Sequence, residues 1–404
     1  MQSAHRDRRG AAALTIVCCV LAVFCEGIDL QAAGVAVGGI GPEFKPSAGQ
    51  LGDFFSASTL GLFIGALAGG RLSDAVGRKR VVIASIALFG LFSLLTALAW
   101  DMRSLFWARV LTGLGLGGAL PNLIALVNES SAVNRRSANV ALTYSGAPFG
   151  GAAASLVSLV IAPAQWRWIF IVGGLVPLLL APIMVAMLHE SPAFERSRGA
   201  QRPHVFAILL QGRASKTLLL WSSFFLGLLT LYLLLNWLPT LLVGNGMSKP
   251  QAAATQIAFN VGGGIAALLM AKVLESRLRG VGIVTTFLAL PALIMLLGHA
   301  PAQPGITMMI VFVLGCAVLA AQAFLYTMAP ACYPTSIRGI GIGAAIAVGR
   351  LGSIAGPKLG GVLRAAGHSY SQLLLDLVPI VMLGSVTALA LAWYMRRAAP
   401  GDEP

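Results

Sequence analysis

Residues 70–80 read Gly-Arg-Leu-Ser-Asp-Ala-Val-Gly-Arg-Lys-Arg, a short charged segment between two long apolar stretches. An apolar stretch of about 20 residues is long enough to cross a bilayer, so we expect a tight turn between two membrane-spanning helices. Gly70 and Gly77 allow close packing and a sharp turn because glycine has no side chain. Asp74 can cap a helix or pair with a following basic residue. Charge alone would indicate only an orienting cytoplasmic loop, whereas this spacing is more specific.

The composition requires lipid as the solvent. Hydrophobic residues make up 57% of the 404 residues and charged residues only 10%, whereas soluble proteins have about 25% charged residues. A net charge of +14 would suggest nucleic acid for a soluble protein, but the basic residues lie between apolar segments, so we expect no nucleic-acid partner. The cysteines lack metal-ligand spacing, so we expect free buried thiols and no metal. They are Cys18, Cys19, Cys25, Cys316 and Cys332.

The apolar segments predict an all-α membrane protein with twelve spans. They must be helices, because a backbone in lipid satisfies its own hydrogen bonds. Lys and Arg gather in alternate connections, so the positive-inside rule predicts two cytoplasmic termini. We expect an N-terminal six-helix half (1–188), a cytoplasmic linker (189–216) and a C-terminal six-helix half (217–404), with an uncleaved first span. The predicted spans are 13–40, 52–71, 81–100, 104–126, 138–161, 168–188, 217–243, 251–271, 281–298, 306–328, 339–362 and 374–395.

The two halves carry an internal repeat. A shift of 202 residues places Arg136 on Arg338, and a glycine-rich helix follows each of them. A shift of 201 residues places Arg78 on Arg279. Two parallel six-helix halves with a site near the bilayer midplane are a known transporter plan.

Two acidic residues, Glu26 and Asp29, lie inside the first predicted span. Positions i and i+3 share one helix face, and both burial and a like-charged neighbour favour the protonated form of a carboxyl group. Because an acidic pair inside a span is costly, we expect it to carry a proton. A structural hydrogen bond or a near-surface pair is the alternative, and the sequence does not distinguish which residue carries the proton.

Arg109 opens a glycine-rich stretch in the fourth predicted span. Its guanidinium stays charged and must find an acid, a carbonyl or water, so it belongs either to a structural pair or to a proton relay. The following glycines, 113, 115 and 117, resemble a dinucleotide-binding loop only superficially, because no strand precedes them. We expect them to let helices approach closely.

Arg350 lies near the middle of the eleventh predicted span. A guanidinium there can bind a carboxylate through two hydrogen bonds, and an internal ion pair is the alternative. Asn236, Gln322 and Tyr144 are further candidates to contact a substrate. Asn236 could instead cap a helix broken near Pro239, and the others could serve helix packing.

Together these motifs resemble the aromatic acid:proton symporter family within the major facilitator superfamily. The resemblance spans nearly the whole chain. It rests on the acidic pair in the first span, where Glu26 replaces the commoner Asp, on residues 70–80, and on residues 109–121. The connection at 275–280 departs from the superfamily pattern, which weakens a gating role there. The resemblance implies a gating motif made of Gly70, Asp74, Gly77, Arg78, Arg80, Glu129 and Arg136.

The resemblance further implies proton-coupled import of an aromatic carboxylate by alternating access, with 3-(3-hydroxyphenyl)propionate or a related hydroxylated aromatic acid as substrate. Glu26, Asp29 and Arg109 would couple protons, and Arg350 would bind the carboxylate. We expect no cofactor, a bacterial inner-membrane location and a functional monomer. The alternatives are an exporter of drug-like or acidic compounds and a non-transporting membrane sensor. A membrane enzyme is disfavoured, because no His, Ser or Cys constellation has catalytic spacing.

Overall fold

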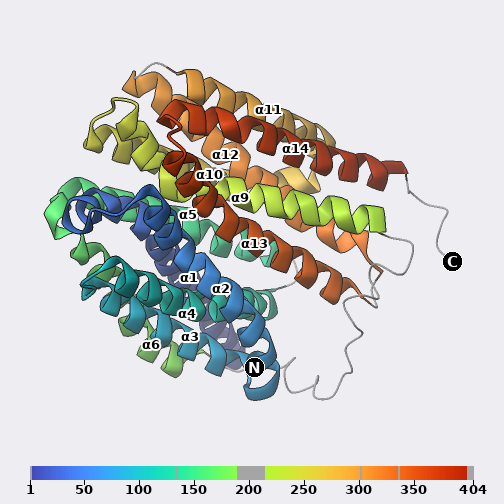
Figure 1. The fold of residues 1–404 in the computed structure, drawn as a ribbon. Coiled ribbons are helices and arrows are strands. Elements are labelled where there is room, and N and C mark those ends of the chain that lie inside the picture. The colour runs from blue at the N-terminus through green and yellow to red at the C-terminus, as the bar shows by residue number, and fades with distance from the viewer. Residues whose placement is uncertain (1, 133–134, 189–213, 301–302, 335–336, 398–404) are drawn as a thin grey trace. The chain divides into compact units, whose positions relative to one another are not determined.

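The computed structural model describes residues 2–132, 135–188, 214–300, 303–334 and 337–397. The chain divides into two compact units, residues 1–200 and 201–404. Figure 1 shows the first unit in blue to green and the second in yellow-green to red. Most of the predicted linker, 189–213, lies outside the described residues, and 214–216 already belong to a helix.

The first unit contains six long helices and one short 3₁₀ turn among its described residues. The helices satisfy their backbone groups internally, as a lipid environment demands. They are α1 (Gln2–Phe44), α2 (Ala48–Val76), α3 (Arg78–Ala97), α4 (Met102–Ser130), α5 (Arg136–Val160) and α6 (Arg167–Met187), with η2 at Pro163–Gln165.

The second unit has the same element count within the described ranges. Its helices are α9 (Ala214–Gly244), α10 (Lys249–Glu275), α11 (Arg279–His299), α12 (Pro304–Met328), α13 (Arg338–Ala365) and α14 (Tyr370–Arg397), with η3 at Ala329–Cys332. The predicted all-α fold with twelve long helices in two six-helix halves is therefore confirmed.

Eleven of the helices in the described ranges are long and apolar enough to cross a membrane. The twelfth, α5, falls outside this group because Ser, Thr, Asn and Gly lower its mean hydropathy. Its length of 25 residues still suffices for a span. Outward helix faces carry large exposed apolar side chains, as contact with lipid requires. Examples are Leu179, Leu269, Leu288, Met309 and Leu383.

Several helices begin at a capping residue. Asp101 accepts a hydrogen bond from the Ser104 backbone N–H at 2.6 Å, and the Ser104 hydroxyl reaches back to the Asp101 backbone. This reciprocal arrangement satisfies two N-terminal donors of α4. The bond from the Ser104 N–H holds the pKa of the Asp101 carboxyl below its ordinary value. Ser47 and Ser248 cap α2 and α10 in the same way.

The two units repeat one packing pattern. In the first, α1 packs on α5, α2 on α4 and α3 on α6; in the second, α9 packs on α13, α10 on α12 and α11 on α14. Glycine permits the closest approach at equivalent places. A Cβ at Gly150 would lie 2.0 Å from the Phe24 carbonyl oxygen, and a Cβ at Gly352 would lie 2.0 Å from that of Phe225. This correspondence supports the predicted repeat.

The glycines of α4 act as expected. A Cβ at Gly113 would lie 1.9 Å from the Ser58 carbonyl oxygen, and one at Gly117 would lie 2.2 Å from that of Leu62. Small residues that let helix backbones meet are typical of packing within a membrane. The predicted role in helix approach is confirmed.

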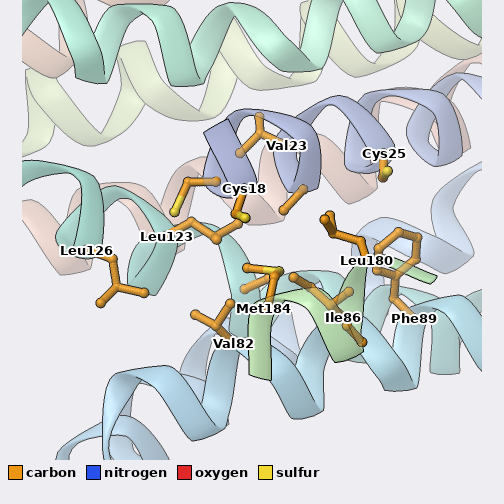
Figure 2. Packing of buried hydrophobic residues seen from close by; sticks show 14 of the residues in the cluster. Cys18, Val23, Cys25, Val82, Ile86, Phe89, Leu123, Leu126, Leu180 and Met184 are labelled. Atoms are coloured by element: carbon orange, nitrogen blue, oxygen red, sulfur yellow. The ribbon is translucent and has the colours of Figure 1, made fainter. Parts of the chain in front are cut away.

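A core of buried hydrophobic side chains, mostly aliphatic, joins α1, α2, α3, α4 and α6. Figure 2 shows Phe89 beside Leu180, and Met184 near Val82 and Ile86. Cys18, Cys19 and Cys25 belong to the same cluster from the α1 side. All five cysteines are free, four of them buried and Cys316 partly buried, as expected. Close packing in the membrane interior supplies the dispersion contacts that hold helices together.

Candidate functional site

The centre of the first unit holds a buried ion pair between α1 and α4. Arg109 donates from one guanidinium nitrogen to Asp29 Oδ1 at 2.7 Å and from the other to the Asp29 backbone oxygen at 3.0 Å. Neither residue has measurable solvent exposure (0% each). The arginine thus meets both an acid and a carbonyl, two of the three partners expected for it. The pair keeps both charges together where isolated charges would be costly.

Two further groups complete the surroundings of Asp29. The Ser93 hydroxyl of α3 lies 3.3 Å from Asp29 Oδ1, and the Phe170 ring of α6 lies 5.3 Å from the Arg109 guanidinium carbon, within cation–π range. Among the described residues, Asp29 Oδ2 and Arg109 Nε have no hydrogen-bond partner. Within the described residues, Asp29 therefore has one oxygen that accepts hydrogen bonds and one that accepts none.

Glu26 lies one turn before Asp29 on α1 and is also buried, with 4% exposure. Each carboxyl has one oxygen that accepts no hydrogen bond from the described residues, Glu26 Oε2 and Asp29 Oδ2. For Asp29 the ion-pair partner on α4 is identified as Arg109. This ion pair is a contact between residues 80 positions apart, which spacing along α1 does not reveal.

The charged turn at residues 70–80 joins α2 to α3. Gly77 has a backbone φ of 104°, a conformation that glycine adopts readily, so the sharp turn expected there is found. A Cβ at Gly70 would meet nothing within 4 Å, so the close packing expected at that position is wrong. The side chain of Asp74 lies outside the described residues.

Arg78, the first residue of α3, forms an ion pair with Glu129 at the end of α4. The predicted gating residues are thus partly brought together, with Glu129 as the observed acid for Arg78. Arg136 donates to the Ser131 backbone oxygen at 3.5 Å, and Arg80 is exposed. In the second unit, Arg338 donates to the Tyr333 backbone oxygen at 3.4 Å, which is the same contact shifted by the repeat.

The second unit buries Arg350 at the interface of α13 with α9. Its guanidinium donates to the Tyr232 hydroxyl at 2.9 Å, and the two residues are 9% and 5% exposed. The phenol oxygen accepts this bond and orients the guanidinium. Sequence reasoning missed Tyr232, because an isolated tyrosine in an apolar helix gives no signal of a partner 118 positions away.

Asn236 lies one turn after Tyr232. Its side-chain amide donates to the Tyr232 backbone oxygen at 2.9 Å, and the residue is 3% exposed. Because α9 continues through Pro239 to Gly244, the alternative that Asn236 caps a broken helix end is wrong.

Gln322 belongs to the second unit and Tyr144 to the first. Gln322, 6% exposed, lines a cavity of about 30 Å³ among α9, α11, α12 and α14, far smaller than the roughly 300 Å³ or more of a ligand pocket. Tyr144 is on α5 and is 36% exposed. The described residues contain no cluster of three His, Cys, Asp or Glu suited to a metal ion.

Comparison with known proteins places these features in a family context. Residues 19–357 match the model of the Major Facilitator Superfamily. The chain is 41% identical over 388 residues to the 3-(3-hydroxy-phenyl)propionate transporter of Escherichia coli (strain K12), covering 96% of each. It is 31% identical over 408 residues to the 4-hydroxybenzoate transporter PcaK of Pseudomonas aeruginosa, and the match covers 93% of this chain and 91% of that protein. The D-xylose-proton symporter structure matches in fold with a TM-score of 0.73 at 17% identity, covering 96% of this chain and 98% of that one.

Proposed function

Because this chain belongs to the major facilitator superfamily, we propose that it imports an aromatic carboxylate together with protons by alternating access. The observation that carries the proposal is that each unit buries an arginine in an apolar helix. Arg109 donates to the carboxylate of Asp29, and Arg350 donates to the hydroxyl of Tyr232. The first suits proton exchange and the second suits binding of an anion. We place the protein in a bacterial plasma membrane as a monomer with both termini cytoplasmic.

The proposed substrate is 3-(3-hydroxyphenyl)propionate or a related hydroxylated aromatic acid. The names and identity of the relatives support this class. Arg350 would take the carboxylate, since its planar fork matches the two oxygens. Asn236, Gln322 or Tyr144 would hydrogen-bond to a ring hydroxyl. The small size of the cavity beside Gln322 counts against Gln322 in that role.

The proposed proton carrier is Asp29, with Glu26 as its neighbour on the same helix. Protonation of Asp29 would remove the charge that attracts Arg109, and the guanidinium would then be free to exchange partners. Its unbonded Oδ2 is the atom that would accept the proton. The ion pair between Asp29 and Arg109 on another helix supports this assignment, because protonation of Asp29 would change a contact between α1 and α4.

Proton coupling also answers an energetic need. An anion entering a cell with a negative interior works against about 2.3 kcal/mol per charge per 100 mV. One proton entering with the anion cancels this electrical cost, and the pH gradient then drives accumulation. A second proton would add the membrane potential as a driving force.

The Arg78–Glu129 pair and the sharp turn at Gly77 are the proposed gate elements on the cytoplasmic side. The pair ties the start of α3 to the end of α4. Forming or breaking it would bias the equilibrium between inward-open and outward-open states without contacting the substrate.

The test of this function uses purified protein in liposomes. Labelled 3-(3-hydroxyphenyl)propionate should accumulate when the outside is made acidic, and unlabelled hydroxylated aromatic acids should compete. Aliphatic sugars and cationic drugs should not compete. Equal competition by those compounds, or uptake that only equilibrates across the membrane, would contradict the proposal.

A further inference from the structure

The Ser93 hydroxyl lies between two acceptors on different helices. It is 3.3 Å from Asp29 Oδ1 on α1 and 3.2 Å from the Phe170 backbone oxygen on α6. Ser93 itself is on α3 and is completely buried, with 0% exposure. A serine hydroxyl has a single hydrogen to donate. It can therefore make a well-aligned hydrogen bond to only one of these two acceptors at a time.

We propose that Ser93 is a positioning residue that responds to the protonation state of Asp29 by donating its hydrogen either to α1 or to α6. When Asp29 is ionised, its Oδ1 is the stronger acceptor, because hydrogen bonds to charged groups are roughly twice as strong as neutral ones. When Asp29 is protonated, that advantage is lost and the Phe170 carbonyl receives the hydrogen. A carbonyl has two lone pairs, so Phe170 can accept this bond beside its own helical one.

Few charged residues are placed close to Asp29 in the described part of the chain, so a single hydrogen bond from Ser93 can affect its protonation. Arg109 on α4 and Glu26 on α1 are the charged residues placed near it by contact or spacing. The helices packed against α1 otherwise carry charge at or near their ends. These residues are Asp53, Arg71 and Asp74 on α2, Arg103 and Glu129 on α4, Arg136 on α5 and Arg167 on α6. On α3, the charged residues are Arg78, Lys79 and Arg80 at its start.

The consequence is a link between proton binding and helix contacts. A hydrogen bond to the ionised form of a carboxyl favours that form, so Ser93 makes proton uptake by Asp29 harder. Protonation also moves a contact from the α1–α3 interface to the α3–α6 interface. The inference rests on the proposed function, because it assumes that Asp29 carries the transported proton.

The experiment measures uptake of labelled 3-(3-hydroxyphenyl)propionate into liposomes as a function of outside pH. Ser93→Ala removes the donor and should move half-maximal uptake to higher pH by about one unit, a roughly tenfold change in proton affinity. Ser93→Thr keeps the hydroxyl and should restore much of the wild-type profile. The matched control is Thr96→Val on the same helix, because Thr96 is equally buried and its hydroxyl donates to the Phe92 backbone oxygen of that helix; its profile should stay unchanged.

The outcomes separate the two claims. If wild-type uptake depends neither on the outside pH nor on a protonophore, the proposal that uptake is coupled to protons is wrong. Coupled wild-type uptake, with a Ser93→Ala profile that is unchanged or moved to lower pH, would overturn the role of Ser93 alone. Should Ser93→Ala fail to reach the membrane, Ser93→Cys provides the comparison, because a thiol is a weak donor of similar size.

Discussion

Breaking the Asp29–Arg109 pair should destabilise the first unit far more than neutralising both residues together. Arg109→Met removes the two hydrogen bonds at 2.7 and 3.0 Å and leaves a carboxylate with 0% exposure. Removing one partner of a buried pair costs about 3–5 kcal/mol, much of it from the uncompensated charge that remains. Asp29→Asn should lower the free energy of unfolding by a similar amount, because it leaves the Arg109 guanidinium buried without its carboxylate partner.

The double variant Asp29→Asn/Arg109→Met removes both charges of the pair, so its loss of unfolding free energy should be well below the sum of the losses in the two single variants. Interaction energies between contacting residues reach about 3 kcal/mol, and we expect a value near the upper end. The assay is unfolding of the purified protein by titration with a denaturing detergent, followed by tryptophan fluorescence. The free energy of unfolding of all four proteins completes the double-mutant cycle.

The matched control is the Glu43–Arg167 pair at the ends of α1 and α6. Its two hydrogen bonds are as short, at 2.6 and 2.9 Å, but its side chains are 36% and 37% exposed. Exposed pairs contribute about 1 kcal/mol or less, so its interaction energy should be much smaller. Additive costs at Asp29 and Arg109, or equal interaction energies for both pairs, would refute the reasoning that burial gives the inner pair its energy.

Three further substitutions test other parts of the molecule. Arg350→Lys should weaken substrate binding at least tenfold, because lysine lacks the planar fork; equilibrium binding with wild-type affinity would remove Arg350 from the site. Glu129→Gln should slow transport more than it weakens binding, since it breaks the pair with Arg78 at a helix end; an unchanged transport rate would make the turn a topology signal only. Gly150→Ala should lower the free energy of unfolding, because its Cβ would lie 2.0 Å from a backbone oxygen of α1; Gly70→Ala, in open space on α2, is the control and should be neutral or slightly stabilising.

The sequence predicts the helices well because lipid leaves the backbone few choices. Apolar length predicts the long helices, of which only α5 is less apolar than the others in the described ranges. Glycines spaced along α4 predict close packing that the structure contains at Gly113 and Gly117. A buried arginine must find a hydrogen-bond partner, so Arg109 is predictable as a residue in need of an acid, a carbonyl or water. The choice of Asp29 was not predictable, since it depends on the distance between α1 and α4.

Neutral partners of charged residues escape prediction from sequence. Ser93 and Tyr232 are ordinary residues within apolar helices, and each gains its importance from a partner far along the chain. The same holds for the gating motif. Its spacing draws attention to Asp74, whereas the acid found beside Arg78 in the described part of the chain is Glu129, 51 positions away.

Accumulation of labelled 3-(3-hydroxyphenyl)propionate by wild-type protein and by Asp29→Asn tests the central claim most directly. With an acidic exterior, wild-type liposomes should reach an inside concentration well above the outside concentration and lose it when a protonophore is added. Asp29→Asn should fail to accumulate the acid, yet should still exchange labelled for unlabelled acid across the membrane, because exchange needs no net proton movement. If Asp29→Asn concentrates the acid to the wild-type level and remains sensitive to the protonophore, the proton is carried elsewhere and the assignment to Asp29 is wrong.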